Sequence, residues 1–185
     1  MADSAPHIVL VGLPGAGKSV VGRRLARSLH RSFVDLDAAI ERRANATVAE
    51  LFARSGEEGF RRLEHELTAE VASGPALVLA PGGGWITRPD TVALIRGRAR
   101  LVYLKASVPT VLRQMGTGIA RRPLLAGDDP AGRLDRLLAE RKSAYESADF
   151  VIKVDDVAPQ EVTKRIIAWL PASDFDLAVP SDAGG

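Results

Sequence analysis

A phosphate-binding loop near the start of the chain constrains the fold more than any other segment. It is the run Gly12-Leu13-Pro14-Gly15-Ala16-Gly17-Lys18-Ser19, which fits the pattern G-x-x-x-x-G-K-[ST]. Residues 8–11 before it form an apolar run typical of a buried strand, and apolar residues recur at helical spacing over 20–29 after it. Because the motif has physical meaning only between a strand and a helix, this context indicates an α/β fold rather than a chance glycine-rich turn.

The loop predicts a binding site for a nucleoside triphosphate. Glycines allow the backbone to turn tightly, so that its N–H groups point at phosphate oxygens, and the following helix adds the positive end of its dipole. Lys18 can reach the β- and γ-phosphates, and the Ser19 hydroxyl can ligate Mg²⁺. We expect nucleotide contacts over the whole segment from Gly12 to Val20.

Composition favours an ordinary globular protein. Of the 185 residues 46% are hydrophobic and 26% charged, and the absence of cysteine excludes disulfides, thiolate metal sites and a cysteine nucleophile. The net charge of +2, with arginine pairs scattered among acids, does not favour nucleic acid as a partner. No apolar run approaches the roughly 20 residues of a membrane span, and residues 1–6 lack the features of a signal peptide. We therefore expect a cytoplasmic monomer that binds neither nucleic acid nor membrane.

Strands and helices are expected to alternate, which predicts a five-stranded parallel sheet covered by helices on both faces. The expected strands are 8–11, 32–34, 76–80, 100–104 and 150–154. The expected helices are 17–30, 36–44, 47–54, 57–73, 89–96, 108–115, 131–147 and 159–170. Thr47 and Ser55, each followed three residues later by glutamate, are typical of capping boxes. We expect one domain over 1–171 and a disordered tail over 172–185.

Residues 116–130 lack clear periodicity and contain three glycines together with Arg121-Arg122-Pro123. A flexible basic loop between two helices of a nucleotide-binding protein is typical of a lid that closes over phosphates. The alternative is an ordinary surface loop.

Two carboxylates, Asp35 and Asp37, lie at the carboxyl end of the second expected strand, where open α/β sheets bind their ligands. Asp35 can hold Mg²⁺ through water, and Asp37 projects into the site from the start of the next helix. Asp155 and Asp156, after the fifth strand, are the rival magnesium acids. The alternative for Asp37 is a helix N-cap, a role that would still leave it able to act on a substrate.

Charged residues fall on two expected inward helix faces: Glu64 in the helix from 57, and Arg141 in the helix from 131. A buried charge is costly unless it is paired or touches a ligand, and Arg61 lies within reach of Glu64. Arg61, Arg141 and the lid arginines together would suit an anionic group such as a carboxylate. Gly82-Gly83-Gly84, directly after the third strand, would allow a ligand to approach the backbone closely, whereas a plain tight turn seldom needs three glycines.

At this point the chain resembles the shikimate kinase family over residues 8–170. The shared elements come in the family's order: the phosphate-binding loop, the acid pair, G-x-x-x-F-R at 56–61, the triple glycine, R-P-L-L at 122–125, and an arginine before Tyr145. The resemblance implies a P-loop fold of the nucleoside-monophosphate-kinase type, with substrate-binding helices over about 36–73 and a mobile lid over about 116–130. It also implies transfer of the γ-phosphoryl group of ATP to the 3-hydroxyl of shikimate, with Mg²⁺ as cofactor.

The resemblance assigns roles to matching positions. Lys18 and Ser19 would serve the phosphates and Mg²⁺, Asp35 would support the metal through water, and Asp37 would bind the shikimate hydroxyls as the expected base. The same resemblance implies the remaining roles. Arg61 and Arg141 would clamp the carboxylate, and Arg122 would reach the phosphates from the lid. The ring would contact Gly82, Gly83 and Gly84, the pocket would be lined by Phe52 and Phe60, and Pro159 would lie near the adenine.

Two positions depart from the family pattern, and two other functions remain open. The arginine that stacks on adenine in the family has no clear counterpart, so Arg113 and Arg121 are both candidates, and Trp85 either belongs to the core or narrows the pocket. A related kinase, such as a gluconate kinase, would not explain why the acid pair, triple glycine and arginines coincide. A ligand-sensing domain of this fold would not need Lys18, Asp35, Asp37 and Arg122 together.

Overall fold

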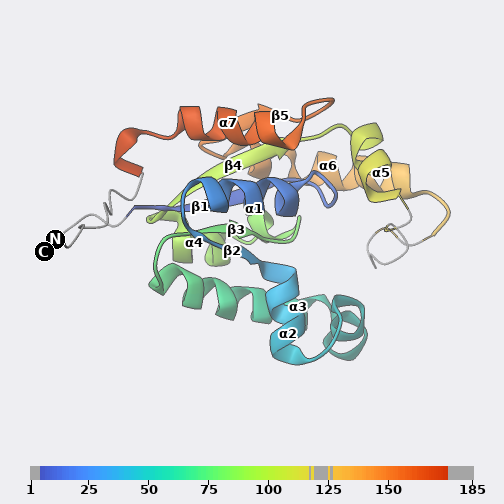
Figure 1. Cartoon of the computed structure of the whole chain (residues 1–185). Helices are drawn as coiled ribbons and strands as arrows, with labels where there is room; N and C mark the ends of the chain where they lie inside the picture. Colours follow the sequence, from blue (N-terminus) through green and yellow to red (C-terminus); the bar gives the residue numbers. More distant parts are fainter. Residues whose placement is uncertain (1–4, 117, 119–124, 126, 175–185) are drawn as a thin grey trace, which may run out of the picture.

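The computed structural model describes residues 5–116, 118, 125 and 127–174. Their strands form one parallel sheet in the order β2-β3-β1-β4-β5 (Figure 1). The strands are β1 (His7–Val11), β2 (Ser32–Asp35), β3 (Leu77–Ala80), β4 (Ala99–Lys105) and β5 (Phe150–Lys153). All four strand pairings are parallel, as the alternation of strands and helices predicts. The predicted fold class is confirmed.

Helices connect consecutive strands. The described α-helices are α1 (Lys18–Ser28), α2 (Leu36–Ala44), α3 (Val48–Ser73), α4 (Pro89–Arg96), α5 (Val108–Met115), α6 (Pro130–Glu146) and α7 (Pro159–Trp169). In Figure 1 the sheet runs between α7, beside the β5 edge, and the α2–α3 pair, beside the β2 edge. Among the described residues, none of the helices is both long and apolar enough to cross a membrane.

The core lies on the central strands. Every residue of β1 is buried, as is every residue of β3, because helices cover both faces of a parallel sheet. Trp85, in a short 3₁₀ helix (Trp85–Thr87), is fully buried, and its indole N–H donates to Thr68 Oγ1 at 3.0 Å. Of the two alternatives for Trp85, the structure therefore supports the core.

Helix α3 joins two segments that the sequence predicts as separate helices. Gly56, with φ +65°, forms a kink at the expected break between them. The Thr47 capping box is present, with Glu50 N–H donating to Thr47 Oγ1 at 3.2 Å and Thr47 N–H donating to Glu50 at 2.7 Å. The predicted box at Ser55 is wrong, because Ser55 Oγ donates instead to the Leu51 carbonyl at 2.9 Å.

The C-terminal end of the described chain contacts Arg100 of β4. Ala172–Asp174 form a short 3₁₀ turn, and the buried Asp174 carboxylate accepts a hydrogen bond of 2.8 Å from Arg100 Nε. The remainder of the tail predicted over 172–185 lies outside the described residues.

The free energy of unfolding should decrease as the pH falls below about 6.5, because of His7, the first residue of β1. This side chain is fully buried, and its Nδ1 accepts the Leu77 N–H at 3.3 Å, which requires an unprotonated nitrogen. Burial, followed by the charges of Arg98 and Arg31, lowers the pKa of His7 below its usual value. The folded state therefore binds a proton less readily than the unfolded state, so His7 contributes its full stability above the unfolded pKa and loses it as the pH falls.

The test compares the free energy of unfolding at pH 7.5 and pH 5.5 for the protein and for His7→Gln. Wild type should lose more stability than the variant over this interval. Equal losses would show that His7 is not the titrating group.

Candidate active site

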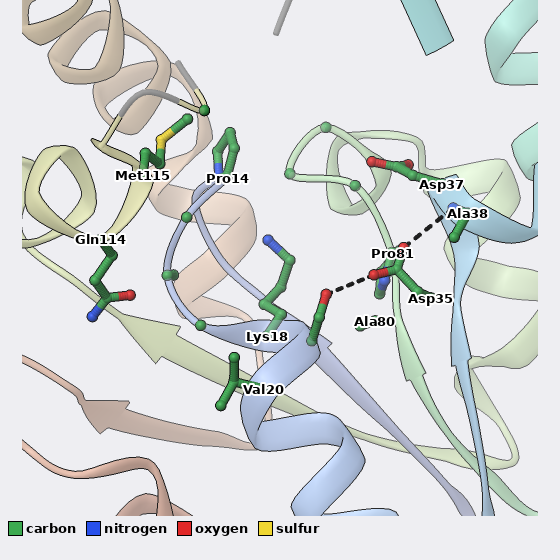
Figure 2. Close-up of a pocket in the computed structure, with 18 of the residues that line it drawn as sticks. Pro14, Lys18, Val20, Asp35, Asp37, Ala38, Ala80, Pro81, Gln114 and Met115 are labelled. Atoms are coloured by element: carbon green, nitrogen blue, oxygen red, sulfur yellow. Dashed lines mark hydrogen bonds between the residues drawn. The ribbon is translucent and has the colours of Figure 1, made fainter. Parts of the chain in front are cut away.

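The phosphate-binding loop has the backbone that its glycines permit. Gly12, Gly15 and Gly17 have φ angles of +145°, +83° and +88°, a region that residues with a side chain rarely adopt. The buried Lys18 ammonium donates to the Gly12 and Leu13 carbonyls at 2.8 and 2.9 Å, which holds it over the loop (Figure 2). The Lys18 ammonium and the backbone N–H groups of the loop thus form one anion-binding site.

Asp35 links the second strand to the phosphate-binding loop. Its Oδ2 accepts a hydrogen bond of 2.6 Å from Ser19 Oγ, and its Oδ1 accepts the Ala38 N–H at 3.3 Å (dashed lines in Figure 2). Asp35, and not Asp37, is therefore the N-cap of α2, and the alternative that Asp37 caps this helix is wrong. Asp37, the second residue of the helix, faces the cavity.

The three glycines after β3 make room for charged side chains. A Cβ atom on Gly82 would lie 3.0 Å from Asp37 Oδ1, and one on Gly83 would lie 3.2 Å from Arg141 Nη1. On Gly84 it would collide with the Arg61 guanidinium. None of the three has a φ in the left-handed region, so close approach, and not an unusual turn, is what requires glycine here.

Arg61 is a buried cation with acidic partners on its own helix. It donates to Glu57 at 2.8 Å and to Glu64, whose carboxylate is 1% exposed. Burial raises the pKa of Glu64 to about 7, against the opposing charge and hydrogen bond of Arg61. The pairing of Arg61 with Glu64 that the helix spacing predicts is confirmed.

Arg141 reaches the same glycine loop from α6 and differs from Arg61 in its partners. It is 8% exposed, and no carboxylate of the described residues forms an ion pair with it. One turn further on, Tyr145 Oη donates to the Gly83 carbonyl at 2.7 Å, which fixes α6 against the loop. A buried guanidinium without an acidic partner is costly unless a ligand supplies the negative charge.

These groups line one cavity of about 940 Å³. The predicted residues that line it are Pro14, Gly15, Ala16, Gly17, Lys18, Ser19, Val20, Asp35, Asp37, Phe52, Phe60, Arg61, Gly82, Gly83, Gly84, Arg141 and Pro159. Gly12 and Leu13 do not line it and act through their carbonyls on Lys18. Arg121 and Arg122 lie outside the described residues.

The residues that line the cavity lie on two sides of the phosphate-binding loop, with Gln114 and Met115 on one side and Asp37 on the other (Figure 2). One half holds Asp37, Arg61, Arg141 and the glycine loop, beside the tilted pair of Phe52 and Phe60, whose ring centroids are 5.0 Å apart. The other half is mainly apolar, and the end of α5, the turn after β5 and the start of α7 contribute to it. Its walls include Gln114, Met115, Val154, Val157, Pro159 and Val162.

Several residues of the apolar half escape sequence reasoning. Gln114 and Met115 belong to no sequence motif. The structure shows why Met115 matters: it packs on Gly15 of the phosphate-binding loop, where a Cβ atom would lie 2.8 Å from Met115 Sδ. Arg113, a sequence candidate for an adenine contact, is 62% exposed and pairs with Asp156, and it does not line the cavity.

Comparison with known proteins decides the family. The family model described as shikimate kinase matches residues 14–171. The chain belongs to the shikimate kinase family. The shikimate kinase of Symbiobacterium thermophilum is 45% identical over 166 residues, which cover 89% of this chain and 95% of that protein. A solved structure of a shikimate kinase from Acinetobacter baumannii in complex with shikimate has a TM-score of 0.84 and 38% identity, covering 89% of this chain and 92% of that one.

Membership of the shikimate kinase family makes the chain an ATP-dependent kinase with an alcohol group as acceptor. A gluconokinase from Sinorhizobium meliloti, with a TM-score of 0.55 and 17% identity over 89% of this chain and 94% of that one, shares the fold alone. The shikimate kinase resemblance in the sequence is confirmed.

Proposed function

We propose that the cavity transfers the γ-phosphoryl group of ATP to the 3-hydroxyl of shikimate, giving shikimate 3-phosphate and ADP. The carrying observation is Arg141, a buried cation without an acidic partner in the described residues, which lies beside the glycine loop in the half of the cavity that contains Asp37. A small ligand with both a carboxylate and hydroxyl groups complements this arrangement. In the reaction, the acceptor oxygen forms a bond to the γ-phosphorus while the bond from that phosphorus to the bridging oxygen breaks.

On the nucleotide side, the proposed roles follow the geometry of the loop. Backbone N–H groups and Lys18 hold the phosphates, with Lys18 opposing the negative charge that shifts in the transition state. The Ser19 hydroxyl and the Asp35 carboxylate, already 2.6 Å apart, offer the oxygen ligands that Mg²⁺ prefers, Asp35 acting through water. When bound there, Mg²⁺ would neutralise part of the negative charge of the phosphates.

On the acceptor side, Asp37 is proposed to orient the hydroxyl and to take its proton. Arg61 and Arg141 would hold the carboxylate, with Gly82, Gly83 and Gly84 against the ring and Phe52 and Phe60 beside it. Arg122, which the family resemblance places on the phosphates, is proposed to reach them from a lid over 116–130.

An assay of ADP release tests this function against its alternatives. The rate of ADP release should increase when shikimate is added. With gluconate, the rate should not exceed the rate measured without any acceptor. Dependence on gluconate would favour the related sugar-acid kinase. Nucleotide binding without turnover on either acceptor would favour a ligand-sensing domain. Size-exclusion chromatography with light scattering tests the separate proposal that the protein is a monomer.

Arg141→Leu should raise the shikimate KM about 10- to 150-fold, because a charge-assisted contact to a bound ligand is worth about 1.5–3 kcal/mol. The ATP KM should change little, since Arg141 lies on the acceptor side of the phosphate-binding loop. Steady-state kinetics with each substrate varied in turn measures both constants.

Arg141→Lys is the matched control for this change. It restores the charge but not the two-pronged guanidinium, so it should recover only part of the affinity. Unchanged shikimate kinetics in a folded Arg141→Leu protein would leave Arg61 as the principal carboxylate contact.

A further inference from the structure

The two acids after β5, Asp155 and Asp156, are turned away from the cavity. Neither lines it, whereas Val154 and Val157 on either side of them do. The four residues form a tight turn in which Val157 N–H donates to the Val154 carbonyl at 3.3 Å and Asp156 has a φ of +55°. The turn thus presents two valines to the cavity and two carboxylates to α5.

Both carboxylates hold α5. Asp155 Oδ1 accepts the Ser107 N–H at 2.9 Å and the Ser107 hydroxyl at 2.8 Å, and Ser107 is the N-cap of α5. Asp156 Oδ1 accepts from Arg113 Nη2 at 3.0 Å, one and a half turns further along the helix. The Asp156 pair is well exposed on both sides and contributes little, so the contact at Asp155 is the stronger one.

Ionisation strengthens the Asp155 contact. Burial acts against the charged form, but hydrogen bonds from Thr110 and Ser107 outweigh it and hold the pKa of the Asp155 carboxyl below its usual value. A carboxylate at this end of α5 also faces the positive end of the helix dipole.

Helix α5 and the turn both contribute walls to the apolar half of the cavity. The far end of α5 supplies Gln114 and Met115, and Met115 packs directly on Gly15 of the phosphate-binding loop. The turn supplies Val154 and Val157 and leads into Pro159. Asp155, which is half-buried, joins these two walls through its hydrogen bonds to Ser107.

We propose that Asp155 is a positioning residue for the nucleotide: it locks the turn after β5 to the start of α5 and so sets the width of the slot that receives the nucleoside. This rests on the proposed function only in placing the nucleoside in the apolar half. Because the phosphates lie on the loop between the halves and the acceptor occupies the charged half, the nucleoside has the apolar half left to it.

The test is the Kd of ADP, measured by calorimetry, together with the ATP and shikimate KM values. Asp155→Ala should raise the ADP Kd and the ATP KM about 3- to 10-fold, the range typical of residues that act through a packed element. The shikimate KM should stay within about twofold, since the charged half shares no contact with Asp155. Asp155→Asn, which keeps an acceptor oxygen, should give an intermediate ADP Kd.

Asp149 offers a matched control at the other end of β5. Its carboxylate also accepts a backbone N–H, that of Leu101 in β4 at 2.7 Å, and it forms an ion pair with Arg96. Asp149 does not line the cavity. Asp149→Ala should lower the Tm and leave the ADP Kd unchanged. If both alanine variants lower the Tm alike and neither changes the ADP Kd, Asp155 is only a structural residue. ADP binding does not require turnover, so this outcome is distinct from a failure of shikimate to act as acceptor.

Discussion

Lys18→Ala is expected to lower kcat roughly 100-fold or more, as the loss of one strong transition-state contact does in other enzymes. The Lys18 ammonium is held over the phosphate-binding loop by the Gly12 and Leu13 carbonyls, and Lys18 lines the cavity. Phosphoryl transfer moves negative charge among the oxygens of the γ-phosphate, and a fixed cation lowers the energy of that state more than the energy of bound ATP. The effect should therefore fall on kcat more than on the ATP KM.

The fold should survive this change, because Lys18 itself lines the cavity, and water entering from the cavity can replace its ammonium group at the two carbonyls. Lys142→Ala is the control: it removes the same charge from the exposed face of α6, next to Arg141. Lys142→Ala should retain full turnover, and Lys18→Ala should keep a normal unfolding transition. Near-normal turnover in a folded Lys18→Ala protein would refute the assignment of the loop.

Local motifs made much of the site predictable. The phosphate-binding loop fixes β1, its turn and α1 at once, and parallel strands bring their carboxyl ends to one edge, so Asp35 and the glycines after β3 had to meet there. Helix periodicity placed Glu64 and Arg141 inward, and both are buried. These inferences depend on sequence neighbours or on a regular period, which a single sequence displays.

Partners between distant segments were not predictable in the same way. Arg61 and Arg141 were both expected to meet an anionic group, yet only Arg61 has acidic partners among the described residues. Asp155 had the same apparent standing as Asp35 at the end of a strand, but a turn with Asp156 at φ +55° directs it toward α5. Prediction can also fail for sequence neighbours: the Ser55 hydroxyl donates to the Leu51 carbonyl within a helix that continues through the kink, and does not cap a new helix. Each outcome depends on side-chain direction, which sequence spacing does not specify.

Asp37→Asn is expected to lower kcat about 10²- to 10⁴-fold, the range attributed to a lost general base. The amide keeps the shape of the carboxylate and can still accept a hydrogen bond, but it cannot take the proton of the acceptor hydroxyl. Asp37 faces Gly82 from the first turn of α2, while Asp35 holds Ser19 and caps the same helix. The two acids are thus separated in role by geometry, one toward the acceptor and one toward the nucleotide.

Asp35→Asn is the matched control, since it makes the same chemical change two residues away. It should raise the Mg²⁺ concentration needed for half-maximal rate and weaken ATP binding, whereas Asp37→Asn should leave the ATP Kd close to that of wild type. Kinetics at varied Mg²⁺, with ATP binding measured separately, distinguishes the two effects. If Asp37→Asn weakened ATP binding and left kcat unchanged, the carboxylate in contact with Gly82 would be the metal residue. The acceptor proton would then have to leave through another group, for which Glu64, whose Oε1 would lie 3.3 Å from a Cβ atom on the same glycine, is the nearest described carboxylate.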